Sequence, residues 1–519
     1  MAAMTNEAMA DRDGYVGDDL RLSAEDDADG LTAPGGGWGP SSYQLAVYAD
    51  VATGKGHTVV LAYAGAGKTT TIMGALASVP KGRTIGLFAF NKSIAIELAS
   101  RAPQGVEVKT LHAHGFAACR RAFKNVTLDD NKSLKICEAF WGPSDPDHAV
   151  RSRYHAVAKL VTMAKDTLVA RGDIDALDAL VDAFDIDCPN EPAQRDAFVR
   201  AAMRVLVRSS EVTHTVDYSD MCWLPVVLNL RVWAYDVVFV DETQDLSPTQ
   251  IELVLMCVRR GGRIIAVGDA RQAIYAFRGA NVDTIDRLVA RLDAKILTLP
   301  VTYRCCRAVV SLAQVEVPDF TAAPNAPEGS VTNGHTVDAL LVNAGPGDMV
   351  ISRTNAPLMG LCLKLLIAGK RAAVKGRDVA EGLIKLVQKS KATTIAGLEA
   401  WLTVWHARET ERLNRRQRPT TETDDKRDCI LALCEGLATV AELLARCDAL
   451  FVNGDNAEGS RITLGTTHKL KGLEADRVWM LESTYRRQKG GEEANVWYVA
   501  VTRSKTDLRM VVKAEEVAA

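Results

Sequence analysis

Short apolar segments alternate with longer stretches of helical periodicity from about residue 40 onward. A first set covers residues 59–62, 84–89, 106–110, 237–240, 264–267 and 296–299. A second set covers residues 349–352, 462–466, 477–481 and 508–512. Most segments of the first set are followed within two residues by Gly, Asp, Asn or His, which is typical of parallel strands with chemistry at their carboxyl ends. We therefore predict the α/β fold class, with two parallel sheets.

Two stretches interrupt this alternation. They carry Ala, Leu, Val and Arg at a spacing of three or four residues, which predicts helices. The predicted division is a first α/β domain at 40–115 and 215–300 with a helical insertion at 116–214, and a second at 301–378 and 455–519 with a short helical insertion at 379–454. The segment 317–347 is rich in Pro, Gly and Asn, so we expect a loop-rich connection there.

The first 39 residues lack hydrophobic periodicity and end in a glycine-rich run. Residues 1–40 hold nine acids and two bases, a net charge of −7, so the remainder carries +4 of the total −3. We predict a disordered acidic tail; a role in autoinhibition or partner binding is the alternative. A nearly neutral total does not exclude nucleic acid, because local basic patches decide such binding.

Localisation follows from two expected absences. The start of the chain is acidic, which predicts no signal peptide, and no apolar run reaches the roughly 18–20 residues that span a bilayer. We expect an intracellular protein without a membrane partner, cytoplasmic or, in a eukaryotic source, nuclear. The eleven cysteines include no C-x-x-C pair, which favours buried free thiols in a reducing compartment. The alternative is a metal cluster of Cys429, Cys434 and Cys447 with His406, whose spacing fits no common zinc pattern.

Residues 59–70 read V-V-L-A-Y-A-G-A-G-K-T-T, a strand followed by a loop of small residues and a helix. Small residues let backbone N–H groups close around phosphate oxygens, and the helix N-terminus favours their charge. Lys68 would reach the β- and γ-phosphates and the Thr69 hydroxyl would bind Mg²⁺. Ala62 stands where the strict pattern has Gly. The expected nucleotide-binding residues are Ala64, Gly65, Ala66, Gly67, Lys68, Thr69 and Thr70.

A second motif supplies carboxylates for hydrolysis. Residues 235–245 read Y-D-V-V-F-V-D-E-T-Q-D, so an apolar strand delivers two adjacent acids to its end. Asp241 would hold Mg²⁺ through water, and Glu242 would polarise the attacking water. The alternative is that the two acids only cap a following helix.

The two motifs resemble the first and second motifs of superfamily 1A helicases, the UvrD/Rep/PcrA group. Six further segments resemble that family's other motifs in the family's order: F-A-F-N-K-S at 88–93, T-L-H-A-H at 110–114, G-D-A-R-Q-A-I-Y-A-F-R-G-A at 268–280, Y-R at 303–304, T-T-H-K-L-K-G-L-E at 466–474 and Y-V-A-V-T-R at 498–503. The resemblance covers residues 40–510. It is nearest to the F-box DNA helicase branch or to a compact bacterial or phage UvrD-like helicase.

The resemblance implies two RecA-like P-loop domains that bind ATP and Mg²⁺ between them. Gln44 would read the adenine and Glu474 would contact the ribose. Gln272 would sense the γ-phosphate, and Arg304 and Arg503 would reach across from the second domain as arginine fingers. Lys471 would lie near phosphate or DNA.

The resemblance also implies a track for DNA. The aromatic rings of Tyr275 and Phe277 would stack on unpaired bases, with burial in the core as the alternative. The expected DNA-binding residues are Asn91, His112, Tyr275, Phe277, Arg278, Arg353 and His468. Five arginines between residues 408 and 418 would either grip duplex phosphates or form a solvated helix face.

Together these features predict an ATP-dependent 3′–5′ DNA helicase or translocase in DNA repair, recombination or replication. Its expected partners are single-stranded DNA and junctions of single- and double-stranded DNA, with single-strand-binding or recombinase proteins as candidate protein partners. The alternative is a DNA-stimulated ATPase that displaces proteins, or that serves as a sensor or assembly subunit of a larger complex.

Overall fold

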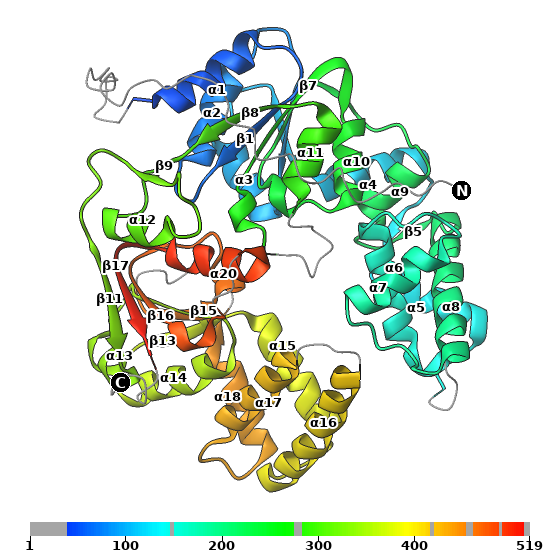
Figure 1. Ribbon diagram of the computed structural model, residues 1–519. Helices are drawn as coiled ribbons and strands as arrows, with labels where there is room; N and C mark the ends of the chain where they lie inside the picture. Colours follow the sequence, from blue (N-terminus) through cyan, green and yellow to red (C-terminus); the bar gives the residue numbers. More distant parts are fainter. Residues whose placement is uncertain are drawn as a thin grey trace, which may run out of the picture.

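The computed structural model describes residues 39–145, 150–274, 283–415, 420–452, 460–486 and 490–512. The predicted acidic tail lies outside these residues except for its last position. Figure 1 shows two α/β units, the first at the top and the second at the lower left, with helix α20 (Gly491–Val501) between them. Two helical insertions extend to the right and to the bottom of the view (Figure 1).

The first α/β unit is built on a six-stranded parallel sheet with the order β3-β2-β6-β7-β1-β8. Its strands are β1 (Thr58–Ala62), β2 (Ile85–Ala89), β3 (Val106–Thr110), β6 (Tyr235–Val240), β7 (Val258–Gly268) and β8 (Lys295–Leu299). Alternate residues of β1 point to opposite faces, so Val59 and Val60 belong to different cores. Because the sheet is covered on both faces, its central strands contain buried apolar runs, and the prediction of six strands here is confirmed.

Helices cover both faces of this sheet. One face packs against α1 (Ser42–Thr53), α2 (Lys68–Ala77) and α3 (Lys92–Arg101). The other face packs against α4 (Leu111–Ala122), α9 (Asp220–Val227), α10 (Pro248–Met256) and α11 (Thr284–Leu292). The phosphate loop predicted from the sequence leaves the sheet between β1 and α2, which places it at the carboxyl edge of the strands.

The first helical insertion has a core of its own. It contains α5 (Lys132–Trp141), α6 (Tyr154–Asp166), α7 (Ile174–Ala183) and α8 (Pro192–Glu211). The short strands β4 (Thr127–Leu128) and β5 (Thr215–Val216) pair at its base.

Four buried charged residues lie where this insertion meets the first unit, and we call them the anchor cluster. They are Lys132, Lys165, Asp217 and Asp220. Lys165 Nζ lies 2.5 Å from Asp217 and 2.8 Å from Asp220. Lys132 Nζ lies 2.5 Å from Asp220 and donates to the Ser209 carbonyl at 2.8 Å. Because each ammonium has at least one carboxylate partner, the buried charges are compensated.

The second α/β unit is built on a seven-stranded parallel sheet with the order β11-β17-β16-β12-β15-β13-β14. Its strands are β11 (Ser330–His335), β12 (Met349–Ser352), β13 (Ala372–Lys375), β14 (Phe451–Val452), β15 (Ile462–Thr466), β16 (Ala475–Leu481) and β17 (Ser504–Val511). One face packs against α12 (Arg307–Ala313) and α20, and the other against α14 (Ala356–Ile367). The prediction of two parallel sheets in an α/β fold is therefore confirmed.

The loop-rich connection expected at 317–347 is wrong in part. The segment contains β10 (Thr321–Ala322), which pairs with β9 (Val301–Thr302), the edge strand β11 and helix α13 (Val337–Asn343). An edge strand tolerates the Asn and Gly residues of β11, because only one side of it is paired. Strand β11, which pairs with β17, was therefore not predicted, because its sequence is polar.

The second helical insertion shares its core with the second sheet. Its helices are α15 (Arg377–Lys389), α16 (Ile395–Arg415), α17 (Thr421–Cys434) and α18 (Val440–Leu450). All eleven cysteines are buried and none is in a disulfide, which confirms the prediction of buried thiols. His406 contacts Asp424, at 2.6 Å, rather than a thiol. No helix within the described ranges has the length and apolar character to span a membrane.

Candidate active site

The phosphate loop, residues 63–67, connects β1 to α2. Gly65 and Gly67 have φ angles of +72° and +76°, in the left-handed region that favours glycine. A Cβ at Gly65 would lie 2.4 Å from the Cβ of Arg304, so a side chain there would collide with the second unit. Gly67 precedes α2 without a capping side chain, which leaves the first N–H groups of this helix to an anion.

Lys68 begins α2 and faces the acidic strand end. Its Nζ lies 3.0 Å from both carboxylate oxygens of Glu242. Burial lowers the pKa of Lys68, but the carboxylates of Glu242, Asp269 and Asp241 outweigh it and raise the pKa above its ordinary value. Lys68 therefore stays charged. Thr69 and Thr70 follow Lys68 in the first turn of α2. The expected nucleotide-binding residues, 64–70, therefore form the loop and the start of this helix.

Asp241 and Glu242 follow the last residue of β6. The backbone N–H of Glu242 donates to Asp241 Oδ1 at 2.9 Å, and Glu242 itself has a φ of +49°, a strained value for a residue with a side chain. Glu242 is the N-cap residue of the 3-10 helix that follows directly, Thr243–Asp245, but its side chain forms no capping hydrogen bond there, and Ser247 and Gln250 form the capping box of α10. The helix-capping alternative is therefore wrong.

The two acids differ in their electrostatic surroundings. Burial, and then the charge of Glu242, raise the pKa of Asp241. Burial also raises the pKa of Glu242, but Lys68 and Lys471 outweigh it and hold that pKa below its usual range. The charged form of Glu242 is therefore stabilised more strongly than the charged form of Asp241.

Sequence reasoning missed the role of Gln244 and Asp269. Gln244 Nε2 donates to Glu242 Oε2 at 2.5 Å, and its Oε1 accepts from the backbone N–H of Asp269 at 3.0 Å. Asp269 Oδ2 in turn accepts from Gln272 Nε2 at 2.8 Å. Burial raises the pKa of Asp269 to about 6. A chain of hydrogen bonds thus connects the expected phosphate sensor Gln272 to Glu242, and the presence of Gln244 within D-E-T-Q-D was the available signal.

The expected adenine-reading residue lies beside the phosphate loop. Gln44 Nε2 donates to Thr71 Oγ1 at 3.1 Å, and a Cβ at Gly67 would lie 3.4 Å from the same nitrogen. The side chain also completes the capping box of α1 with Ser41.

The two expected arginine fingers come from the second α/β unit and lie together. Arg304 forms an ion pair with Glu474, which also pairs with Lys505 at 3.0 Å. Arg503 is 1% exposed, and its Nε and Nη1 donate to the carbonyls of Val499 and Leu473. Burial, reinforced by neighbouring Arg304, lowers the pKa of Arg503 to about 10.

The two α/β units meet around the phosphate loop. Lys471 Nζ, from the second unit, lies 2.7 Å from Asp245 Oδ2 and donates to the Gln272 carbonyl at 2.7 Å. Asn495 Nδ2 donates to the Ala273 carbonyl at 3.0 Å. The backbone N–H of Ala64 donates to Tyr498 Oη at 3.1 Å, and Ala64 is buried in the core of the second unit. The loop is therefore part of the interface.

The expected DNA-binding residues divide into three groups. In the first unit, Asn91 Oδ1 caps α3 by accepting from the Ile94 N–H at 2.9 Å. The His112 ring stacks on Tyr218 with centroids 4.0 Å apart, and burial lowers the pKa of His112 to about 4.

In the second unit, Arg353 Nη2 lies 2.7 Å from Glu493 Oε1, so its charge is paired. Burial, and then the charge of Arg353, lower the pKa of His468 to about 4. Arg353 and His468 therefore lie near each other. The third group, Tyr275, Phe277 and Arg278, lies outside the described residues.

Arg412 and Arg415 of the arginine-rich stretch have acidic partners. Arg412 pairs with Glu409 at 2.8 Å and with Asp185 of the first insertion at 3.4 Å. Arg415 pairs with Glu411. These pairs favour the solvated helix face over a grip on duplex phosphates.

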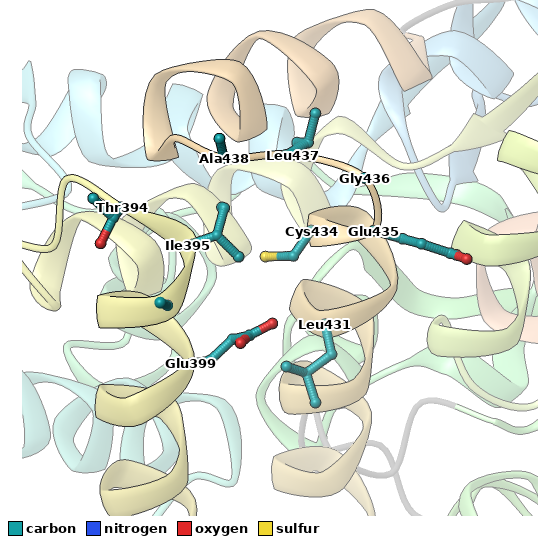
Figure 2. Close-up of a pocket in the computed structure, with 10 residues that line it drawn as sticks. Thr394, Ile395, Glu399, Leu431, Cys434, Glu435, Gly436, Leu437 and Ala438 are labelled. Carbon is teal, nitrogen blue, oxygen red and sulfur yellow. The ribbon is translucent and has the colours of Figure 1, made fainter.

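A hollow of about 590 Å³ lies in the second insertion, where α16 and α17 approach the start of α18. Figure 2 shows Glu399 and Cys434 pointing into it from facing helices. Burial raises the pKa of Cys434 to about 11, so its thiol stays protonated. No lysine or arginine is among the residues that line this hollow, in contrast to the phosphate loop with Lys68.

Comparisons with known proteins agree with this geometry. Residues 46–292 match the UvrD/REP helicase N-terminal domain, and residues 408–515 match the UvrD-like helicase C-terminal domain. The chain belongs to the UvrD/Rep family, the UvrD-like superfamily 1A helicases, as the motifs predicted.

Individual relatives are distant. F-box DNA helicase protein 1 of Schizosaccharomyces pombe is 22% identical over 503 residues, 86% of this chain and 55% of that protein. ATP-dependent DNA helicase Rep of Escherichia coli is 25% identical over 292 residues, 50% of this chain and 41% of Rep. ATP-dependent DNA helicase UvrD2 of Mycobacterium tuberculosis is 25% identical over 554 residues, 88% of this chain and 76% of UvrD2. The chain thus spans about half the length of the first two relatives.

Proposed function

We propose that the protein is an ATP-driven motor that moves 3′ to 5′ on single-stranded DNA and unwinds duplex, in DNA repair, recombination or replication. The observation that carries this proposal is the phosphate loop at the interface of two α/β units, with Lys68 and Glu242 paired on one side and Arg304 and Arg503 close by on the other. A site completed by two units converts ATP binding into relative motion. The predicted domain division is part of this proposal.

The residues present fit a triphosphate with Mg²⁺. Left-handed glycines, the open N-terminus of α2 and the charged Lys68 would hold the phosphates, and the Thr69 hydroxyl and Asp241 would hold the metal. Bound Mg²⁺ supplies positive charge against the phosphate oxygens. Gln44 would contact the adenine and Glu474 the ribose.

Glu242 is the proposed base, and its ion pair with Lys68 allows nucleotide binding to change its pKa. Lys68 must leave Glu242 to reach a phosphate oxygen. Loss of this cation raises the pKa of Glu242, which makes the carboxylate a better acceptor for a proton of water. Gln244 Nε2 would still donate to Glu242 Oε2 after Lys68 has left, so the orientation of the carboxylate is retained.

Charge that develops on the phosphoryl oxygens would be stabilised by Arg304 and Arg503. Both arginines move with the second unit, so hydrolysis depends on a closed cleft. The proposed DNA track combines Asn91 and His112 of the first unit with Arg353 and His468 of the second, together with Tyr275, Phe277 and Arg278. Relative movement of the two units would then advance the strand.

ATP hydrolysis with and without single-stranded DNA, at one stated salt concentration, tests the proposal. Strong stimulation by DNA is expected, and duplexes with a 3′ or a 5′ tail then report the polarity. Hydrolysis indifferent to DNA would contradict the motor and favour a sensor or assembly ATPase.

A second candidate is a translocase that strips proteins from DNA with little unwinding. The acidic partners of Arg412 and Arg415 favour it, because paired arginines offer less grip on a duplex. Displacement of a bound single-strand-binding or recombinase protein, compared with strand separation on the same substrate, distinguishes the two activities.

A further inference from the structure

Tyr63 lies at the root of the phosphate loop, and its backbone fixes the loop at two points. Its N–H donates to the carbonyl of Leu299 at the end of β8, at 3.2 Å. Its carbonyl accepts from the N–H of Ala66 at 3.0 Å and so closes the turn that carries Gly65. A displacement of Tyr63 therefore displaces the loop.

The side chain of Tyr63 crosses to the second unit. Its Oη donates to Asp319 Oδ2 at 2.6 Å, and its ring meets Phe320 edge-on with centroids 6.2 Å apart. Phe320 in turn meets Tyr498 edge-on at 5.8 Å. We call these three rings, Tyr63, Phe320 and Tyr498, the aromatic strap. Since Tyr498 also accepts from the Ala64 N–H, two consecutive residues of the loop are bonded to the second unit.

The middle ring of the strap, Phe320, is held in place by burial and by backbone contacts. Phe320 is fully buried, and its carbonyl accepts from Gln314 Nε2 at 2.9 Å. The next residue, Thr321, begins β10, which pairs with β9. The Phe320 N–H also donates to the Val317 carbonyl at 3.0 Å, so Asp319 lies within a hydrogen-bonded turn. Burial, and then Asp319, raise the pKa of Tyr63 well above its ordinary value, so the phenol remains a donor at physiological pH.

We propose that Tyr63 is a positioning residue that ties the seating of the phosphate loop to the second unit through Asp319. The inference rests on the function proposed above, in that the loop is taken to bind ATP. Tyr63 contacts no phosphate in this proposal. Its hydrogen bond stabilises the closed arrangement of the two units, and a nucleotide that needs this arrangement binds more tightly as a result.

Four variants test the tether: Tyr63→Phe, Asp319→Ala, their double variant, and Asp319→Asn, which keeps an acceptor oxygen. Tyr63→Phe and Asp319→Ala should each weaken Mg-ATP affinity in equilibrium titration, and raise KM, about three- to tenfold, the contribution of one hydrogen bond. The double variant should be no weaker than either single one, because both remove the same interaction. Asp319→Asn should recover most of the affinity. Turnover at saturating ATP should fall less than the affinity does, because bound nucleotide itself drives closure.

Tyr154→Phe is the matched control. Tyr154 donates to the Gly142 carbonyl at 2.9 Å wholly within the first insertion, so its loss should leave nucleotide affinity unchanged. Thermal unfolding of every variant checks that the fold is retained. Unchanged affinity in Tyr63→Phe, or additive losses in the double variant, would overturn the tether. A wild-type protein that binds Mg-ATP without DNA-stimulated hydrolysis would overturn the proposed function instead, and one that binds no Mg-ATP would overturn both.

Discussion

Two charge clusters of this protein combine lysines and carboxylates in different proportions. The anchor cluster pairs two lysines with two aspartates. The cluster at the cleft sets two lysines against four carboxylates: Lys68 and Lys471 against Asp241, Glu242, Asp245 and Asp269. Burial raises the pKa of three of these carboxyls, those of Asp241, Asp245 and Asp269.

The difference in balance indicates a difference in use. In a buried cluster with equal numbers of positive and negative charges, every charge is already paired, and removal of one residue leaves an uncompensated charge. An excess of carboxylates favours a further cation, and it lets Lys68 leave Glu242 while other anions remain nearby. The anchor cluster therefore holds an insertion in place, whereas the cleft cluster is arranged to change.

Replacing Lys68 with alanine should break the cleft cluster with the largest effect. The variant loses the cation that faces the phosphates, so ATP turnover should fall at least about a hundredfold, to background. Circular dichroism and size-exclusion chromatography should show an intact fold. Retained turnover would sink the assignment of residues 63–67 as a phosphate loop.

Glu242→Gln is a second test of the cleft cluster. It keeps the shape and removes the base, so ATP and DNA should still bind while turnover slows about a hundredfold or more. Single-turnover hydrolysis with pre-bound ATP measures the step directly. Wild-type rates would mean that another group activates the water.

Asp220→Ala should break the anchor cluster. It removes a partner of both buried lysines, and the expected loss is about 3–5 kcal/mol in the free energy of unfolding. The midpoint of thermal unfolding, followed together with limited proteolysis of the insertion, measures it.

Asp196→Ala is the surface control for that loss. It removes an exposed pair with Arg200, which should contribute no more than about 1 kcal/mol. Nucleotide affinity of the folded Asp220→Ala protein should match wild type; a large change would show that the two clusters are linked.

Lys471→Ala should give the smallest effect, a shift in pH dependence. Burial raises the pKa of Asp245 to about 6, and Lys471 opposes this rise. Removing the cation destabilises the carboxylate, so the pKa of Asp245 should rise further, by about one unit. Below that pKa the carboxyl is neutral. Lys471 also lowers the pKa of Glu242, so both carboxyls should take up a proton at a higher pH in the variant. The fall in turnover on acidification should therefore begin at a higher pH than in wild type, and an unshifted profile would contradict this electrostatic role of Lys471.

The parts of the molecule that sequence predicts well are those whose cause is local. Each central strand is buried on both faces and reads as an apolar run, and Lys68, Asp241 and Glu242 directly follow or face strand ends. Strand β11 was missed because its place depends on pairing with β17, about 170 residues later. The contact of Tyr63 with Asp319 was missed for the same reason, since no periodicity connects positions 256 residues apart.

The strand order of the second sheet also orders events during synthesis. Strand β17 lies between β11 and β16, and β11 has no other neighbour in that sheet. A ribosome delivers the chain from its N-terminus, so β11 must wait until residues 504–511 have emerged, whereas the first sheet has all its strands once residue 299 is free. A nascent chain would thus display a complete phosphate loop before Arg503 exists. On the function proposed above, the growing protein could hold ATP without yet consuming it.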